Sequence, residues 1–143
     1  MSRPAALSIL LVDDEIDLLA EVARYLRRRG HRVDTAESYA AAEALIDIAT
    51  SPDVLITDMR MPGGTGLDLA YRARHRHPRC RIVVMTGHLE QEQVGTDDGG
   101  ELAVLFKPFS FSRLLALVNG VDAPPDGSTV LPIPAPVALS NVA

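Results

Sequence analysis

The sequence predicts an α/β fold in which a doubly wound, five-stranded parallel sheet carries helices on both faces. Two observations along the 143 residues predict this fold. Short apolar runs alternate five times with segments whose apolar residues recur at helical spacing. The runs are almost continuously apolar, as expected of strands that are buried on both faces. Alternating buried strands and amphipathic helices favour a parallel sheet with right-handed crossovers.

Five short apolar segments are predicted to be the strands. In chain order they are Leu7–Val12, Arg32–Ala36, Asp53–Thr57, Arg81–Met85 and Ala103–Phe106. In parallel sheets covered by helices, functional groups sit at the carboxyl ends of the strands. The residues that follow each strand are therefore the first place to look for chemistry.

Helices are predicted after the first, second, third and fifth strands. The first has apolar residues at helical spacing from Ile16 to Leu26 and ends in Arg27–Arg29 and Gly30, which suit a helix C-terminus. The others are marked by Ala42, Leu45, Ile46 and Ala49, by Leu67, Ala70 and Ala73, and by Phe111, Leu114, Leu115 and Val118 after a Ser110 cap. Residues Met61–Gly66 are predicted to form a loop.

Two segments break the regular alternation. Gly87–Gly100 contains four glycines and almost no apolar face, so we expect a fourth helix that is at most a short turn near Leu89–Val94, followed by a mobile acidic loop. Residues 121–143 are rich in proline, which argues against a packed element, yet their apolar content leaves open whether they lie on the domain or on a neighbouring molecule. We therefore predict a domain over residues 1–120 and a tail over 121–143, with no output domain.

Composition excludes several classes of function. The net charge is −5, which disfavours nucleic acid as a direct partner, and we interpret Arg27–Arg29 as a helix end. No apolar run approaches the roughly 20 residues of a membrane helix, and no secretory signal is visible. The single cysteine, Cys80, excludes an internal disulfide and a multi-cysteine metal site. These features predict a cytoplasmic protein without a membrane partner.

Charged and polar side chains follow four of the predicted strands. Asp13 and Asp14 follow the first strand, Asp58 the third, Thr86 the fourth and Lys107 the fifth. Lys107 is the only lysine among 14 basic residues. Three neighbouring carboxylates repel one another, and a hard divalent cation resolves that conflict. Mg²⁺ favours one or two carboxylates plus phosphate oxygens, whereas zinc is disfavoured because no cysteine or histidine follows these strands.

This arrangement predicts Mg²⁺-dependent formation of an aspartyl phosphate. Asp58 lies on the central strand and is the expected nucleophile. Lys107 and the Thr86 hydroxyl, with the Gly87 N–H, are expected to hold phosphoryl oxygens. The predicted metal ligands are Asp14 and Asp58, Asp13 through a metal-bound water, and the backbone carbonyl of Arg60.

Four motifs resemble the receiver domain of two-component response regulators. They are Asp13-Asp14-Glu15, Asp58-Met59-Arg60-Met61-Pro62-Gly63, Met85-Thr86-Gly87 and Lys107-Pro108-Phe109, within about residues 7–120. The resemblance implies a flavodoxin-like fold with strand order 2-1-3-4-5 and a cis Lys107–Pro108 bond. It also implies self-phosphorylation from a phosphohistidine donor, either a histidine kinase or a histidine phosphotransfer protein, and a downstream partner that the sequence does not identify.

The chain departs from the receiver pattern in its predicted fifth strand. Receivers usually carry Tyr or Phe three residues before the lysine, where this chain has Val104. Valine has no large rotamer change to report a signal, and Phe106 is expected on the opposite face of the strand. Together with the weak helix in Gly87–Gly100, this predicts unusual signal transmission, through ordering or disordering of that segment.

Two further hypotheses stand beside the phosphorylated switch. A receiver-fold interaction module that works without phosphorylation would explain Val104, although such members usually lose the acidic residues or the lysine. A phosphatase similar to haloacid dehalogenases is disfavoured, because its nucleophile lies in a DxD motif after the first strand, where this chain has Asp13-Asp14-Glu15. We therefore expect a phosphoacceptor rather than a turnover enzyme. Whether it forms a homodimer, and whether it is a fragment of a larger protein, stay open.

Overall fold

The chain forms eight strands and four helices within the residues that the computed structural model describes, namely 6–48, 51–87, 101–120 and 129–132. In chain order these elements are β1 (Ser8–Val12), α1 (Ile16–Arg28), β2 (Arg32–Ala36), α2 (Tyr39–Asp47), β3 (Val54–Asp58), β4 (Arg60–Met61), β5 (Gly64–Thr65), α3 (Gly66–Arg76), β6 (Arg81–Thr86), β7 (Glu101–Phe106), α4 (Phe111–Val118) and β8 (Thr129–Pro132).

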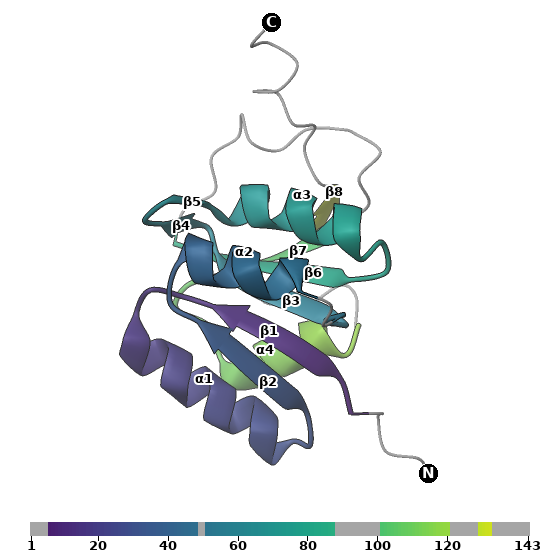
Figure 1. The fold of residues 1–143 in the computed structure, drawn as a ribbon. Coiled ribbons are helices and arrows are strands. Elements are labelled where there is room, and N and C mark those ends of the chain that lie inside the picture. The colour runs from purple at the N-terminus through teal and green to yellow at the C-terminus, as the bar shows by residue number, and fades with distance from the viewer. Residues whose placement is uncertain (1–5, 49–50, 88–100, 121–128, 133–143) are drawn as a thin grey trace, which may run out of the picture.

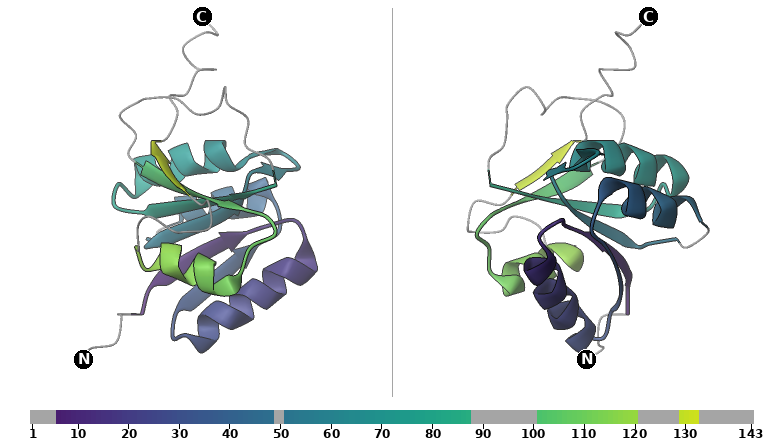
Figure 2. Two further views of the ribbon diagram at one scale, coloured as in Figure 1. Left: turned by 180° about the vertical axis from the view of Figure 1, so that it is seen from behind. Right: turned by 60° about the vertical axis from the view of Figure 1, so that its left-hand side comes forward.

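One sheet organises the molecule (Figure 1). Its strand order is β2-β1-β3-β6-β7-β8, and the first five strands are parallel. Helices α2 and α3 cover one face of the sheet, and α1 and α4 cover the other, as the views in Figure 2 show. The order of the five parallel strands is the predicted 2-1-3-4-5, so the predicted fold class is confirmed.

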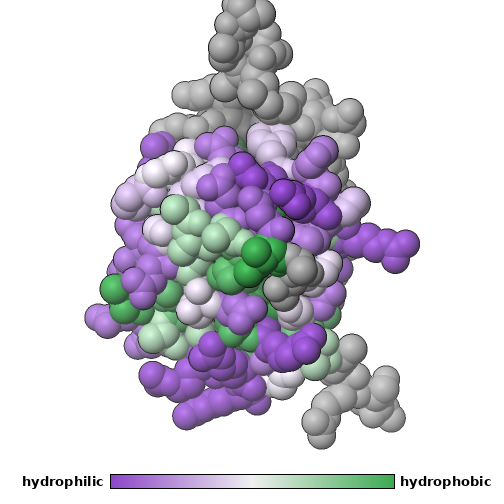
Figure 3. Space-filling view, in the orientation of Figure 1, coloured by the Kyte–Doolittle hydropathy of each residue, from purple (hydrophilic) through white to green (hydrophobic). Residues whose placement is uncertain are grey.

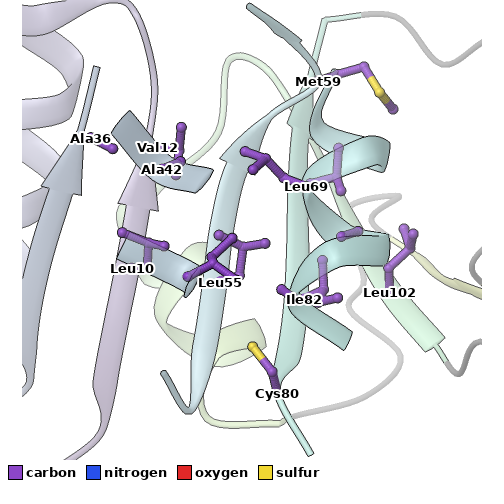
Figure 4. Close-up of a cluster of buried hydrophobic side chains, with 14 of the residues drawn as sticks. Leu10, Val12, Ala36, Ala42, Leu55, Met59, Leu69, Cys80, Ile82 and Leu102 are labelled. Atoms are coloured by element: carbon purple, nitrogen blue, oxygen red, sulfur yellow. The ribbon is translucent and has the colours of Figure 1, made fainter. Parts of the chain in front are cut away.

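Alternate residues of each central strand feed two separate cores. Figure 4 shows the core beneath α2 and α3, in which Leu10, Leu55 and Ile82 from three neighbouring strands belong to one cluster with Leu69 of α3. The intervening residues Ile9, Leu11, Val54, Ile56, Val83, Met85, Ala103 and Leu105 pack against α1 and α4. Because successive side chains of a strand point to opposite faces, an unbroken apolar run supplies both cores at once. This explains why the strands could be predicted from their composition.

Short polar side chains cap the N-termini of three of the helices. The Ser38, Thr65 and Ser110 hydroxyls accept hydrogen bonds from the N–H groups of Ala41, Asp68 and Arg113 at 3.1 Å. Such caps satisfy donors that the first turn of a helix leaves unpaired. The predicted Ser110 cap is therefore confirmed.

Three features differ from the sequence predictions. The predicted loop at Met61–Gly66 contains a two-residue antiparallel pairing between β4 and β5 before α3 begins. Residues 129–132 of the predicted tail form β8, which pairs antiparallel with β7. Phe106 packs against the same core as Val104, because residues two apart along a strand point to the same face, so its predicted orientation was wrong.

The weak fourth helix predicted near Leu89–Val94 lies outside the described residues. Within the described ranges, no helix combines the length and the apolar character that crossing a membrane requires. Apolar side chains nevertheless gather on the surface over α2 (Figure 3). Ile48, which directly follows α2, is 59% exposed.

Candidate functional site

Three aspartates converge at the carboxyl ends of β1 and β3. One carboxylate oxygen from each of Asp13, Asp14 and Asp58 lies within 4.8 Å of the others. β1 and β3 are adjacent and parallel, with Val12 opposite Thr57, so the residues that follow each strand reach the same rim. The sequence prediction that these carboxylates meet is confirmed by this geometry.

The three carboxylates differ in burial and in their fixed contacts. Asp13 is buried, Asp58 is partly buried and Asp14 is exposed. The Asp13 carboxylate accepts a hydrogen bond of 2.9 Å from the Glu15 N–H, and its own N–H donates to Ala36 O at 3.1 Å. Asp13 is therefore held by the backbone of Glu15, just before α1, and of Ala36 in β2, whereas Asp14 is exposed.

Lys107 brings a positive charge into this carboxylate cluster from the end of β7. Its Nζ lies 3.2 Å from Asp58 Oδ1, 3.5 Å from Asp13 Oδ2 and 3.9 Å from Glu15 Oε1. The Lys107 N–H donates to Thr86 O at 2.8 Å, which continues the ladder from β6. The Lys107–Pro108 bond is cis, as the resemblance implied.

Burial and neighbouring charges together shift the pKa values of Asp58 and Lys107. Burial raises the pKa of the Asp58 carboxyl, Lys107 opposes that rise, and the Asp13 and Asp14 charges add to it. Burial would lower the pKa of Lys107, but the Asp13 and Asp58 carboxylates outweigh it and the pKa is raised. One ammonium thus faces several negative charges. The donor set of clustered hard oxygens fits a divalent cation such as Mg²⁺.

The other predicted site residues lie around this cluster. Thr86 ends β6 and is buried, next to Asp58 in the sheet, because Met85 is opposite Asp58. Gly87 follows it and is exposed, and a Cβ there would meet nothing within 4 Å. Arg60 begins β4 two residues after Asp58. Metal coordination by its carbonyl stays a prediction, as do the roles assigned to Thr86 and Gly87.

Gly66 was missed by the sequence analysis. A Cβ at this first residue of α3 would lie 2.5 Å from the backbone oxygen of Asp58. The Gly66 N–H donates to Met59 O at 2.7 Å, and the Thr57 hydroxyl donates to Asp58 O at 2.9 Å. The backbone behind Asp58 is therefore crowded on one side by α3. Three glycines close after Asp58 were the available signal, but the sequence could not show which one touches it.

Val104, at the position where receivers usually carry Tyr or Phe, lies in the core. It is 1% exposed and packs in the cluster beneath α2 and α3, with Phe106 partly buried against the same cluster. In the sheet, Val104 is opposite Val84 and Phe106 is opposite Thr86. The aromatic ring next to Thr86 is thus supplied by a residue adjacent to Lys107.

Comparisons with known sequences all point to one protein family. The response regulator receiver domain model matches residues 9–119. The photosynthetic apparatus regulatory protein RegA of Rhodovulum sulfidophilum is 34% identical over 126 residues, covering 82% of this chain and 66% of that protein. The DNA-binding transcriptional regulator NtrC of Escherichia coli is 35% identical over 113 residues, covering 78% and 24%. RegA of Cereibacter sphaeroides is 41% identical over 81 residues, and the match spans 44% of its length.

Solved structures agree with this result. A response regulator receiver protein from Sinorhizobium medicae has a TM-score of 0.70 and 31% identity, covering 82% of this chain and 98% of that one. A response regulator from Burkholderia pseudomallei, with a phosphorylated aspartic acid, a calcium ion and citrate, has a TM-score of 0.66 and 26% identity, covering 78% and 65%. Because the family model spans most of the chain and these neighbours share its sheet, the chain belongs to the response regulator receiver domains, with their flavodoxin-like fold.

Proposed function

We propose that Asp58 accepts a phosphoryl group from a phosphohistidine donor in a Mg²⁺-dependent reaction, and that the chain acts as a conformational signalling switch. The observation that carries this proposal is the contact of 3.2 Å between Lys107 Nζ and Asp58 Oδ1, beside two further carboxylates. A histidine kinase or a histidine phosphotransfer protein would be the donor, and the cytoplasm is the proposed location.

The proposed reaction is a direct displacement at phosphorus. A carboxylate oxygen of Asp58 forms the new O–P bond while the N–P bond of the phosphohistidine breaks, and its electron pair stays on the imidazole. Lys107 shifts from the free carboxylate toward a phosphoryl oxygen, which its flexible stem and three donors allow. The Thr86 hydroxyl and the Gly87 N–H would hold other phosphoryl oxygens. The donor's imidazole leaves as a neutral ring when its second nitrogen carries a proton, and the Asp58 carboxylate itself neither gains nor loses a proton.

Asp14 and Asp58 would hold Mg²⁺ directly, with Asp13 acting through a bound water and Arg60 through its carbonyl. The cation supplies charge neutralisation for the phosphoryl oxygens. Three clustered carboxylates face a single ammonium, that of Lys107, so a bound cation would neutralise the remaining negative charge, which supports the proposal. The phosphorylated aspartic acid and the metal ion in the Burkholderia pseudomallei protein support this assignment.

A second candidate is a receiver-fold module that binds its partner without phosphorylation. The observation that favours it is Val104, whose buried, stiff side chain offers no large rotamer change. Both candidates keep the same fold, so only the chemistry at Asp58 separates them. In either case the chain would be a phosphoacceptor or a binding module, rather than an enzyme with turnover.

The test is intact-mass spectrometry after incubation with acetyl phosphate, with and without Mg²⁺. We expect one phosphoryl group on the wild-type chain, dependent on Mg²⁺ and lost in Asp58→Asn. Asp68→Asn is the matched control, because Asp68 is exposed in the first turn of α3 and is not one of the clustered carboxylates. Absence of both the adduct and Mg²⁺ binding in folded protein would favour the module.

A further inference from the structure

A groove runs between α1 and β2, along the outer edge of the sheet. It has a volume of about 570 Å³ and is lined on the helix side by Ile16, Leu19, Ala20 and Ala23 and by three arginines. Thr35 and Glu37 line it on the strand side. Figure 1 shows α1 lying alongside β2 at this end of the sheet. None of the clustered carboxylates Asp13, Asp14 and Asp58 lines this groove.

One wall of the groove is the free edge of the sheet. β2 is the terminal strand of the described sheet, and only β1 pairs with it. The Arg32 N–H donates to Leu7 O and Ala36 O accepts from the Asp13 N–H, so these alternate residues of β2 face β1. The peptide groups of Val33 and Thr35 must therefore face outward. An edge of this kind can accept one further strand.

The α1 side of the groove has an apolar floor, formed by Ile16, Leu19, Ala20 and Ala23, and carries three arginines toward one end. Ile16 is 57% exposed at one end of the groove, and Ala20 is exposed at its middle. Arg27 Nη2 donates to Val33 O at 2.7 Å, which anchors one guanidinium at the strand edge. Arg24 and Arg28 line the same end, and residues 24–32 contain five arginines and no acidic residue on a chain of net charge −5.

We propose that this groove binds an extended acidic segment of a partner protein, which adds to the edge of β2 at Thr35. Its acidic side chains would meet Arg24 and Arg28, and small apolar side chains would cover Ala20 and Ala23. Glu37, at the other end, disfavours acidic residues there, so the acidic part of the segment would lie at the end lined by Arg24 and Arg28. The floor contains no aromatic ring on which a base could stack, which favours a peptide over single-stranded nucleic acid.

The test is fluorescence anisotropy of a labelled decapeptide, titrated with the full chain. Its odd positions carry alanine in one half and glutamate in the other, with threonine between them, because alternate side chains of an extended segment share one face. We expect saturable binding that weakens with added salt, and no binding of the counterpart with lysine in place of glutamate. The double variant Arg24→Glu/Arg28→Glu should weaken binding about tenfold or more. Arg79→Glu is the matched control, because this exposed arginine lies outside the groove, and it should stay within about twofold of wild type.

A second pair of variants tests the floor. Ala20→Asp places a negative charge in the groove and should also weaken binding about tenfold, whereas Ala40→Asp, on the exposed surface of α2, should not. Phosphorylation by acetyl phosphate should be unchanged in all four variants, which separates this groove from the Asp58 site. Equal binding by Ala20→Asp and wild type would overturn the proposal. So would binding of a labelled single-stranded oligonucleotide that displaces the acidic peptide.

Discussion

Lys107 Nζ lies 3.2 Å from Asp58 Oδ1 and 3.5 Å from Asp13 Oδ2, so one ammonium joins the ends of β7, β3 and β1. No other lysine is present in the sequence. Because three strands deliver these groups to one rim, the sheet itself fixes their separation. The charge balance of the site thus depends on a single side chain.

Removing the Lys107 ammonium should raise the pKa of the neighbouring Asp58 carboxyl. In Lys107→Met, without metal, we expect the pKa of Asp58 to rise further, because Lys107 lowers it in the wild type. Phosphorylation by acetyl phosphate should slow by about 100-fold, as for loss of one charge-stabilising donor. Carboxyl carbon NMR titration and the rate of adduct formation measure the two effects. An unchanged Asp58 titration would contradict the assigned contact, and Arg79→Met serves as the control.

Gly66 should tolerate no side chain, whereas Gly87 should tolerate one. A Cβ at Gly66 would lie 2.5 Å from Asp58 O, but a Cβ at Gly87 would meet nothing within 4 Å. We expect Gly66→Ala to reduce the free energy of unfolding by about 1–3 kcal/mol, since backbone must shift to make room. Gly87→Ala should leave it within about 0.5 kcal/mol. Urea denaturation of both variants gives the comparison, and equal stabilities would show that α3 does not crowd Asp58.

His31 should make the fold sensitive to acid. Burial lowers the pKa of His31, and its Nδ1 accepts a hydrogen bond of 3.1 Å from the Leu7 N–H. Below pH about 6.5 the unfolded chain binds a proton that the folded chain resists, so stability falls as pH falls, by at most about 1.4 kcal/mol per pH unit.

His31→Asn keeps an acceptor near the Leu7 N–H but removes the titration. Between pH 7 and 5 it should therefore lose less stability than the wild type, in thermal or urea unfolding. The exposed His75, changed to Asn, should keep the wild-type dependence. A His31→Asn chain as acid-sensitive as the wild type would assign the pH dependence to other groups.

Cys80 should be chemically silent in the folded chain. The thiol is buried, and burial raises its pKa to about 11. A thiol that stays protonated and covered reacts slowly, since the thiolate is the nucleophile. Ellman's reagent at pH 8 should therefore label Cys80 only after urea is added. Ser112→Cys, on the exposed side of α4, gives a second thiol that should react at once. Rapid labelling of wild-type Cys80 would contradict its burial.

β8 should protect the edge of β7. It pairs with β7 from Glu101 opposite Pro132 to Val104 opposite Thr129. A chain that ends after Gly120 should keep its helix and strand content by circular dichroism, but it exposes unpaired edge groups that promote association between chains. Sedimentation should then depend on concentration, whereas a chain that ends after Pro132 should behave like the full chain. Identical sedimentation of both would leave β8 without this role.

The sequence alone was sufficient to predict the features that depend on local residue patterns. The continuous apolar runs predicted the parallel strands because residues such as Leu10 and Leu11 feed opposite cores. The convergence of Asp13, Asp58 and Lys107 followed from the rule that parallel strands end at one rim. These inferences needed no distances.

Features that depend on distant packing were not predictable. β8 ends in Pro132 within a proline-rich segment, so its local signal indicates no strand, and pairing with β7 overrides it. Gly66 could not be told apart from Gly63 and Gly64, because only the approach of α3 to Asp58 distinguishes them. The groove beside β2 likewise arises from where α1 lies, rather than from any motif.

The identity of the phosphorylated residue tests the proposed function most directly. After incubation with acetyl phosphate and Mg²⁺, borohydride reduces an aspartyl phosphate to homoserine, and peptide mapping then locates the changed residue. We predict homoserine at position 58 alone, absent without Mg²⁺ and absent in Asp58→Asn. Homoserine at Asp13 or Asp14, or none in folded chain that binds Mg²⁺ and has received acetyl phosphate or a phosphohistidine donor, would contradict Asp58 as the phosphoacceptor.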